Sequence, residues 1–550
     1  MTTSSANPTA PLTEQARRLQ QAMIGAAGPE ATGYASTQDL PPVPASVRTD
    51  RGTVAVLGAG VAGLTIAYEL RKRGYDVVIL EATERVGGRN RTARRGDVLF
   101  ELNDAGVAEQ THECRFDHGL YLNLGPGRIP YHHRRVLGYC YDFGVALEPY
   151  IMETTAAFKA LHTDDITPVR WRNRQIANDT RGYLAATLAE LVQEKMPRRD
   201  PDNPLLDLLR VFGGLEKDFK YRGSTRSGYA QELEVEEFEK PIPPLKFEEL
   251  IASRFWKHRF YQPVDYLWQG TMFQPVGGMD QIVRAFEQRL GRILLTNAEV
   301  LRIKLTDPGV EVRYRRLGRE EVLHVDYCVS NIPMPVLRTM KLEGVRREFQ
   351  EAVDFVPFEA TCKVGWQAEQ RFWENDENQI FGGISWTDDL INQVWFPSND
   401  YFTAHGTLTG AYNFQEDAKK LGKMSPLDRL LKARECAQRL HPQFGKDEIV
   451  PLDKGVSIAW HKVPFQLGGF AAWKPEEESH MKAYRQLLTA QGQNGSFFVT
   501  GDQASPLPGW QEGAMMSAHY VLYQILGITP LQAPEIQRVP DTAALTQGLR

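Results

Sequence analysis

A short apolar segment that runs into a glycine-rich turn constrains this chain more than any other feature. Val54–Leu57 has the length and apolar character of a buried parallel strand, and Gly58, Gly60 and Gly63 follow it. Apolar residues at helical spacing come next. A turn of this kind lets the backbone approach a pyrophosphate, which unpaired N–H groups at the helix N-terminus can bind. The segment therefore predicts a strand, a phosphate-binding turn and a helix.

A second strand and an acidic residue complete this pattern. Asp76–Leu80 has strand character, and Glu81 follows it, 18 residues beyond Gly63. A carboxylate at this distance can accept hydrogen bonds from ribose hydroxyl groups. The order of strand, glycine turn, helix, strand and acid is far more specific than the glycines alone. It predicts an α/β protein with a doubly wound, Rossmann-like domain that binds a dinucleotide.

The residues after Glu81 indicate which dinucleotide is bound. Together with Glu84–Thr92 (ERVGGRNRT), Glu81 gives the pattern ExxxRxGGRxxT. Its two glycines form a bare loop that can lie against a second phosphate, and Arg85 and Arg89 bring cations to that loop. The segment resembles the flavin amine oxidase family, and the resemblance implies that the cofactor is FAD.

Length and composition limit the number of domains, the partners and the cysteine chemistry that can be expected. A chain of 550 residues exceeds what one hydrophobic core supports, so two or more domains are expected. The net charge of −5 gives no reason to expect nucleic acid or an anionic membrane as a partner. Five scattered cysteines without a CxxC pair favour buried free thiols over disulfides or a metal site. No apolar run reaches the roughly 18 residues of a membrane span. The first 50 residues also lack the apolar core of a signal peptide, so we expect a cytoplasmic protein.

The resemblance, together with the pattern along the chain, predicts an interleaved domain organisation. An FAD-binding domain is expected from residues 51–122, 266–345 and 480–530, and a mixed-sheet substrate-binding domain from 123–135 and 346–479. Residues 136–265 show charged helical faces and predict a helical insertion. Residues 1–50 predict an N-terminal extension and linker, and residues 531–550 a C-terminal tail.

Arg128 is the residue that best discriminates between the possible classes of substrate. It lies in Asn123–Arg135 (NLGPGRIPYHHRR), where two glycines and a proline predict a turn ahead of a helix. An arginine here could be a surface charge, or a buried fork that binds a carboxylate through two hydrogen bonds. The segment resembles the LGxxRIP segment of L-amino acid oxidases, whose arginine binds the substrate α-carboxylate. The resemblance therefore implies this role for Arg128, while His132–Arg135 are expected to form a solvated helix face.

The resemblance implies further substrate contacts. Lys363 lies in an alternating, strand-like segment and matches the family lysine that holds a water against flavin N5, a catalytic role. Tyr412 matches the tyrosine that shares the substrate carboxylate with Arg128. Four other positions match the pocket, Phe414, Phe470 and Trp510 as its wall and Gly509 as the carbonyl that accepts from the substrate amine. Taken singly, each aromatic residue could equally belong to a hydrophobic core.

The predicted cofactor contacts come from several parts of the chain. Phe497–Asp502 predicts a strand that ends in glycine and an acid, where the family more often has glutamate in place of Asp502. Some amine oxidases attach the flavin through a cysteine in this region, and none is present here, which implies non-covalent FAD. No metal ligand is predicted. The complete set of predicted contacts is Gly58, Gly60, Ala62, Gly63, Glu81, Arg89, Gly127, Arg128, Val300, Trp460, Asp502, Trp510 and Gln511.

Together these residues predict an FAD-dependent L-amino acid oxidase. A hydride would pass from the substrate Cα to flavin N5, the imino acid would hydrolyse to a 2-oxo acid and ammonia, and O₂ would be reduced to H₂O₂. The aromatic wall predicts uncharged substrates, including aromatic ones, and the resemblance implies a homodimer. Three alternatives remain: an L-amino acid 2-monooxygenase that releases an amide, a monoamine or polyamine oxidase, and a flavoprotein without catalytic activity.

Overall fold

The computed structural model describes Leu40 and residues 51–163, 166–195, 203–231, 233–235, 238, 240–489 and 495–528. Apart from Leu40, the extension predicted over residues 1–50 lies outside the described residues, as does the tail predicted over 531–550.

A five-stranded parallel sheet forms the centre of the part that contains the glycine turn. Its order is β12-β2-β1-β16-β23, and every neighbouring pair is parallel. The strands are β1 (Thr53–Leu57), β2 (Asp76–Leu80), β12 (Leu294–Leu295), β16 (Tyr327–Ser330) and β23 (Phe497–Val499). Helix α2 (Val61–Lys72) follows β1 directly. The predicted strand, glycine turn, helix and second strand are confirmed.

A seven-stranded mixed sheet forms the second large layer, and five of its strands come from residues 346–479, for which a mixed sheet is predicted. Its order is β10-β9-β19-β20-β21-β18-β22, and only β19 and β9 pair in parallel. The strands are β9 (Phe158–Thr163), β10 (Ile166–Arg172), β18 (Thr361–Ala368), β19 (Ile384–Thr387), β20 (Gln393–Trp395), β21 (Gly406–Phe414) and β22 (Gly455–Ala459). Every residue of β18 is buried, and its register with β21 places Lys363 opposite Tyr412.

Smaller sheets connect these two layers. A three-stranded sheet joins β7 (Ile129–Pro130), β11 (Met272–Pro275) and β8 (Leu147–Tyr150) in the order β7-β11-β8. A four-stranded sheet contains β13 (Ala298–Leu305), β14 (Val310–Arg316), β15 (Arg319–Val325) and β17 (Lys341–Glu343). Two short pairs are β3 (Thr92–Arg94) with β6 (Tyr121–Asn123), and β4 (Val98–Leu102) with β5 (Ala108–Glu113). Among the described residues, five further α-helices lie outside these sheets: α8 (Met334–Leu337), α9 (Arg347–Phe355), α10 (Gln415–Lys423), α11 (Pro426–Ala437) and α12 (Glu478–Thr489).

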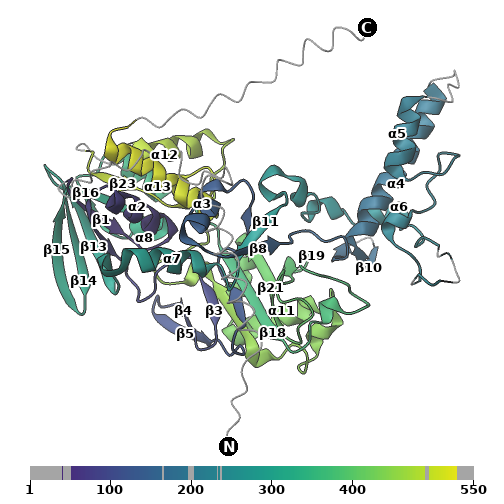
Figure 1. The fold of residues 1–550 in the computed structure, drawn as a ribbon, viewed down its shortest axis with the longest axis horizontal. Coiled ribbons are helices and arrows are strands. Elements are labelled where there is room, and N and C mark those ends of the chain that lie inside the picture. The colour runs from purple at the N-terminus through teal and green to yellow at the C-terminus, as the bar shows by residue number, and fades with distance from the viewer. Residues whose placement is uncertain are drawn as a thin grey trace, which may run out of the picture.

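The segment predicted as a helical insertion is helical only in part. Helices α4 (Asn173–Lys195) and α5 (Pro204–Gly213) form an arm that projects from the body in Figure 1, and α6 (Phe247–Ala252) follows them. Residues 147–172, however, contain β8, β9 and β10, so the helical prediction is wrong there. Strand β8 pairs with β11 and β9 pairs with β19, both more than 100 residues away, and spacing within one short segment cannot reveal such pairing. Strand β10 pairs with its neighbour β9.

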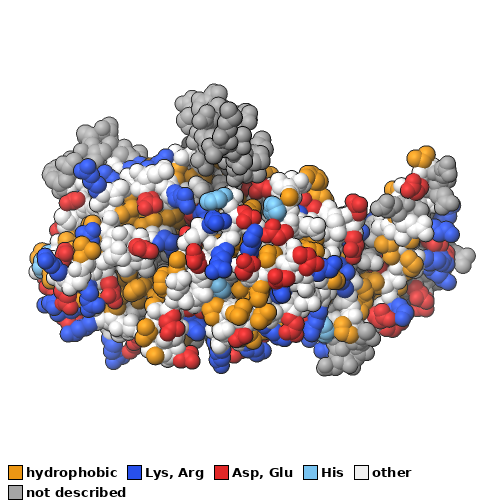
Figure 2. Space-filling model, turned by 90° about the horizontal axis from the view of Figure 1, so that it is seen from below, with side chains coloured by type: hydrophobic (Ala, Val, Ile, Leu, Met, Phe, Trp, Pro, Cys, Tyr) orange, Lys and Arg blue, Asp and Glu red, His pale blue; other side chains and the backbone are white. Residues whose placement is uncertain are grey.

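The surface carries both signs of charge. Figure 2 shows lysine, arginine, aspartate and glutamate side chains interspersed over the visible face.

All five cysteines are buried and free, as predicted. Among the helices of the described residues, none combines the length and apolar character needed to cross a bilayer.

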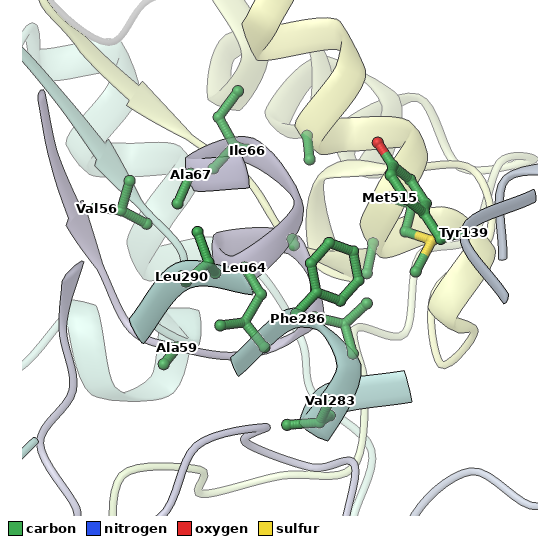
Figure 3. Close-up of a cluster of buried hydrophobic side chains, with 14 of the residues drawn as sticks. Val56, Ala59, Leu64, Ile66, Ala67, Tyr139, Val283, Phe286, Leu290 and Met515 are labelled. Carbon is green, nitrogen blue, oxygen red and sulfur yellow. The ribbon is translucent and has the colours of Figure 1, made fainter. Parts of the chain in front are cut away.

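The core around α2 fixes the position of the glycine turn. Side chains of α2, α7 (Asp280–Leu290) and α13 (Gln511–Leu526) meet in one buried cluster, together with Tyr139 of α3 (Arg134–Phe143) (Figure 3). Leu64 and Phe286 are fully buried there. Because burying each large apolar side chain contributes about 1.5–3 kcal/mol, this packing holds the N-terminus of α2 firmly against the end of β1.

Candidate active site

The glycine turn brings the backbone of β1 and α2 into unusually close contact. A Cβ atom on Gly63 would lie 2.1 Å from the Gly58 carbonyl oxygen, and Gly58 has a φ of +94°. Helix α2 begins after Gly60, which has no side chain to cap it. The Asn331 side-chain oxygen accepts from the N–H groups of Gly60 and Gly63 at 3.3 and 3.2 Å once the amide is oriented to satisfy both. The glycines leave the backbone of the turn bare at the N-terminus of α2, where a pyrophosphate can bind, although Asn331 accepts from two of its N–H groups.

Glu81 lies where the dinucleotide pattern expects the acid. Its carboxylate accepts from the Ala59 N–H at 2.8 Å, and from the Thr83 N–H and hydroxyl at 3.0 and 2.8 Å. These bonds orient the carboxylate at the carboxyl end of β2, beside the first turn of α2.

The two arginines of the second glycine loop differ in what they contact. Arg85 donates to the backbone carbonyls of Val86, Gly88 and Asn90, so it holds the loop together. Arg89 pairs with Asp502 and donates to the carbonyl oxygen of Gly469. One guanidinium therefore ties together three segments that are far apart in the sequence.

A single cavity of about 1240 Å³, measured with its open mouth, runs from the glycine turn to the second sheet. Most predicted cofactor contacts line it: Gly58, Gly60, Ala62, Glu81, Arg89, Val300, Trp460, Asp502, Trp510 and Gln511. Glycines and an acid at one end, and Trp460 and Lys363 toward the other, fit an extended dinucleotide that carries an aromatic ring system. The remaining predicted contacts, Gly63, Gly127 and Arg128, lie outside this lining.

Gly63 and Gly127 serve close packing in the structure. Gly63 lets α2 approach β1, and a Cβ on Gly127 would lie 2.8 Å from the Trp395 ring. Trp460 donates from its indole N–H to the Leu124 carbonyl oxygen at 3.0 Å. Gln511 accepts from the Asn90 side-chain amide at 2.7 Å at the start of α13.

Arg128 is buried without an acidic partner in the described part of the chain. Its residue is 8% exposed, and its guanidinium carbon lies 4.6 Å from the ring centroids of both Trp268 and Trp395 and 5.8 Å from that of Trp510. Its Nε atom makes no hydrogen bond. Burial lowers the pKa of Arg128, and the nearby hydroxyls of Tyr150 and Tyr412 act in the opposite direction. A buried cation among aromatic rings calls for an anionic ligand.

Lys363 is a second buried cation in the same region. It is 2% exposed, and its Nζ donates to the carbonyl oxygens of Gly125 and Asn123 at 2.6 and 3.2 Å. Burial, and then repulsion by Arg128, lowers the pKa of Lys363 to about 7. Lys363 therefore gains and loses its proton in the neutral range.

The predicted aromatic wall is brought together by strand β21, which carries Tyr412 and Phe414, and by the segments that carry Phe470 and Trp510. The ring of Tyr412 lies 5.2 Å from Trp395 and 4.6 Å from Phe414, and Phe414 lies 6.2 Å from Phe470. Gly509, with a φ of +80°, packs against the Phe470 ring and donates its N–H to Asp502 at 2.8 Å. Because Asp502 also pairs with Arg89, its carboxylate links the cofactor end of the cavity to the substrate end.

Sequence reasoning missed several residues around Arg128. Trp268 and Trp395 cover its guanidinium, and Tyr150 reaches it from β8, yet none belongs to a recognisable motif. The predicted solvated face over His132–Arg135 is also wrong in part. His133 is buried, packs edge-on against Trp510 at 4.8 Å, and has its pKa lowered to about 3 by burial. Arg135 pairs with Glu512 at 3.0 Å.

Comparison with known proteins decides the family. The family model described as flavin containing amine oxidoreductase matches residues 61–525. The chain belongs to this family. It is thus an oxidoreductase that uses a flavin, and FAD fits the cavity described above.

Named relatives of this flavin amine oxidase act on amino acids. The flavin-dependent L-tryptophan oxidase RebO of Lentzea aerocolonigenes is 27% identical over 492 residues, which cover 84% of this chain and 96% of that protein. An L-amino-acid oxidase of Siganus canaliculatus is 27% identical, over 84% of this chain and 83% of that protein. Among solved structures, putrescine oxidase bound to putrescine superposes with a TM-score of 0.54 at 16% identity, covering 86% of this chain and 99% of that one. The latter similarity shows a shared fold.

Proposed function

We propose that this flavin amine oxidase is an L-amino acid oxidase, which converts an L-amino acid, O₂ and water to a 2-oxo acid, ammonia and H₂O₂. The observation that carries the proposal is the Arg128 guanidinium, buried among three tryptophans without an acidic partner in the described residues. An amine without a carboxylate would leave this charge unpaired, which is costly in a buried site. The relatives that oxidise L-amino acids support the same assignment.

The substrate carboxylate would bind between Arg128 and Tyr412. A guanidinium can hold both carboxylate oxygens, and the Tyr412 hydroxyl can donate a third hydrogen bond. Trp268 and Trp395 limit the movement of the guanidinium, and they exclude water from the ion pair. Arg128 thereby fixes one end of the substrate.

The substrate amine would lie toward Gly509, whose carbonyl can accept one of its hydrogens. The bound FAD supplies the two-electron acceptor and the reaction with O₂. Binding the carboxylate and the amine on either side of Cα orients the Cα–H bond and reduces the entropic cost of the reaction. The side chain would then extend along Phe414, Phe470 and Trp510.

Lys363 would assist the oxygen-dependent half of the reaction. Its ammonium group lies on the cavity wall beside Tyr412, with Nζ 4.6 Å from the ring centroid. Two carbonyl oxygens hold the group in place. A cation there can stabilise negative charge that develops on oxygen, while its low pKa lets it release and regain a proton near neutral pH.

Two further properties are part of the proposal. The FAD would be bound without a covalent link, because all five cysteines are buried in the core and none lines the cavity. Denaturation followed by filtration would show whether the flavin separates from the protein.

The protein would form a homodimer, which light scattering of the purified protein would test.

The central experiment is to measure peroxide release with each of the twenty L-amino acids and with the D-enantiomers as controls. We expect peroxide with L-substrates and reduction of the flavin by the same substrates under anaerobic conditions. Detection of an amide instead of a 2-oxo acid would indicate a monooxygenase. A flavin that stays oxidised with every amino acid would contradict the proposal.

A further inference from the structure

An arginine from the inserted segment, Arg259, lies against the aromatic wall of the site. Its guanidinium carbon is 4.7 Å from the ring centroid of Phe414, which itself lies 4.6 Å from Tyr412. Arg259 is in a turn between two short 3₁₀ helices, η2 (Phe255–Lys257) and η3 (Gln262–Val264), and has a φ of +57°. A left-handed backbone is unfavourable for arginine, so the surroundings must hold the turn in this form.

Buried contacts on both sides of Arg259 hold this turn. Lys159, which is fully buried, donates from Nζ to the carbonyl oxygen of His258 at 2.6 Å. Phe255, also buried, packs edge-on against Phe260 with 4.9 Å between ring centroids. Because the residues before and after Arg259 are fixed, the direction of its side chain is set by the packed turn.

Arg259 has no acidic partner among the residues that the structure describes. Surrounding protein lowers its pKa through desolvation, Tyr412 raises it, and Arg128 lowers it further. The residue nevertheless keeps an exposed surface. Its guanidinium therefore lies at the edge of the aromatic wall, where it remains open to solvent.

Two cations therefore flank one row of aromatic rings. Arg128 lies over Trp395, Trp395 is 5.2 Å from Tyr412, and Tyr412 is followed by Phe414 and then by Arg259. A substrate whose α-carboxylate binds Arg128 would extend its side chain along this row. Beyond Lys363, which lies beside Trp395 and Tyr412, the next charged group along this row is the guanidinium of Arg259.

We propose that Arg259 forms a side-chain subsite that binds the carboxylate of an acidic L-amino acid, such as glutamate. This inference rests on the proposed function. It departs from the sequence-based prediction of uncharged substrates, because the predicted wall contains no charge and Arg259 adds one from the insertion. Neutral side chains can still pack on Phe414 and Phe470. Lysine and arginine as substrates would be repelled by the same guanidinium.

The test compares kcat/KM for L-glutamate, L-phenylalanine and L-lysine in the wild type, Arg259→Gln and Arg259→Lys. We expect Arg259→Gln to lower kcat/KM for L-glutamate about tenfold or more, because a charge-assisted hydrogen bond is lost. The value for L-phenylalanine should stay within about twofold. Arg259→Lys should retain part of the activity with L-glutamate. The matched control is Lys257→Gln, which removes an exposed cation two residues away. It should leave the ratios of kcat/KM among the three substrates unchanged.

Ligand binding gives a second readout that does not depend on turnover. Titration of the holoenzyme with pentanedioate and pentanoate, followed by flavin absorbance, should show that Arg259→Gln weakens only the dicarboxylate. An unchanged glutamate-to-phenylalanine ratio in Arg259→Gln would overturn the inference. An equal loss with every substrate would also overturn it, since that result indicates general attraction of anions. Absence of activity with every L-amino acid in the wild type would instead count against the proposed function.

Discussion

Replacement of Arg128 by methionine is the sharpest test of the carboxylate site. Methionine keeps much of the length of arginine and its contact with the three tryptophans, but it removes the charge. Truncating one partner of a buried, hydrogen-bonded charge pair costs about 2–5 kcal/mol. The structure places Arg128 in this class, because it is buried and no acidic residue of the described part of the chain pairs with it.

This loss corresponds to a roughly 30- to 5,000-fold lower kcat/KM for L-phenylalanine. Phenethylamine, the same molecule without the carboxylate, should not suffer this loss, so the ratio of the two substrates isolates the contribution of the ion pair. Peroxide release measures both, and flavin absorbance verifies that FAD is retained. Arg134→Met, at an exposed arginine of the same segment, is the control. A decrease of less than about threefold with L-phenylalanine would refute the assignment of Arg128.

Further predictions concern the oxygen-dependent step, the glycine turn and the ion pair that links the two ends of the cavity. Lys363→Met should slow the reaction of the reduced enzyme with O₂ on the order of tenfold at pH 6. In the wild type this rate should fall as pH rises through about 7, where Lys363 loses its proton, and a stopped-flow pH profile that is the same in both proteins would contradict the assignment. Gly63→Ala should weaken FAD retention during purification, since its Cβ would meet a backbone oxygen at 2.1 Å, whereas Gly270→Ala, which meets no atom within 4 Å, should not. Arg89→Gln should cost about 3 kcal/mol of stability by leaving the Asp502 carboxylate unpaired. Thermal unfolding should show partial recovery when Asp502→Asn is added, and no recovery would argue against the pair.

The nucleotide-binding part could be predicted from the sequence because its determinants are local. Gly58, Gly60 and Gly63 lie within six residues, and Glu81 follows at the end of the next strand, so spacing along the chain translates directly into geometry. Arg85 shows the limit of this reasoning. It has the same charge as Arg89 and belongs to the same pattern, yet only contacts in the folded protein show that it holds its own loop.

The substrate end was predictable only where the family resemblance supplied it. The rings that surround Arg128 come from Trp268 and Trp395, which are more than 130 residues away in the sequence and have no spacing signal of their own. Arg259 is a similar case, because a lone arginine in a polar insertion gives no sign that it meets Phe414. Such contacts depend on how distant strands pair, and short-range periodicity contains no information about that pairing.

The proximity of Arg128 and Lys363 couples anion loading to proton uptake. Repulsion between these groups is one cause of the low pKa of Lys363. A carboxylate that neutralises Arg128 removes part of this repulsion, so the affinity of Lys363 for a proton rises when the anion arrives. By reciprocity, a protonated Lys363 strengthens anion binding by the same factor. Near pH 7, binding of a carboxylate together with proton uptake by Lys363 would thus leave the net charge of the pocket almost unchanged. At alkaline pH, Lys363 loses its proton before any other group of the site titrates, and carboxylate binding should weaken.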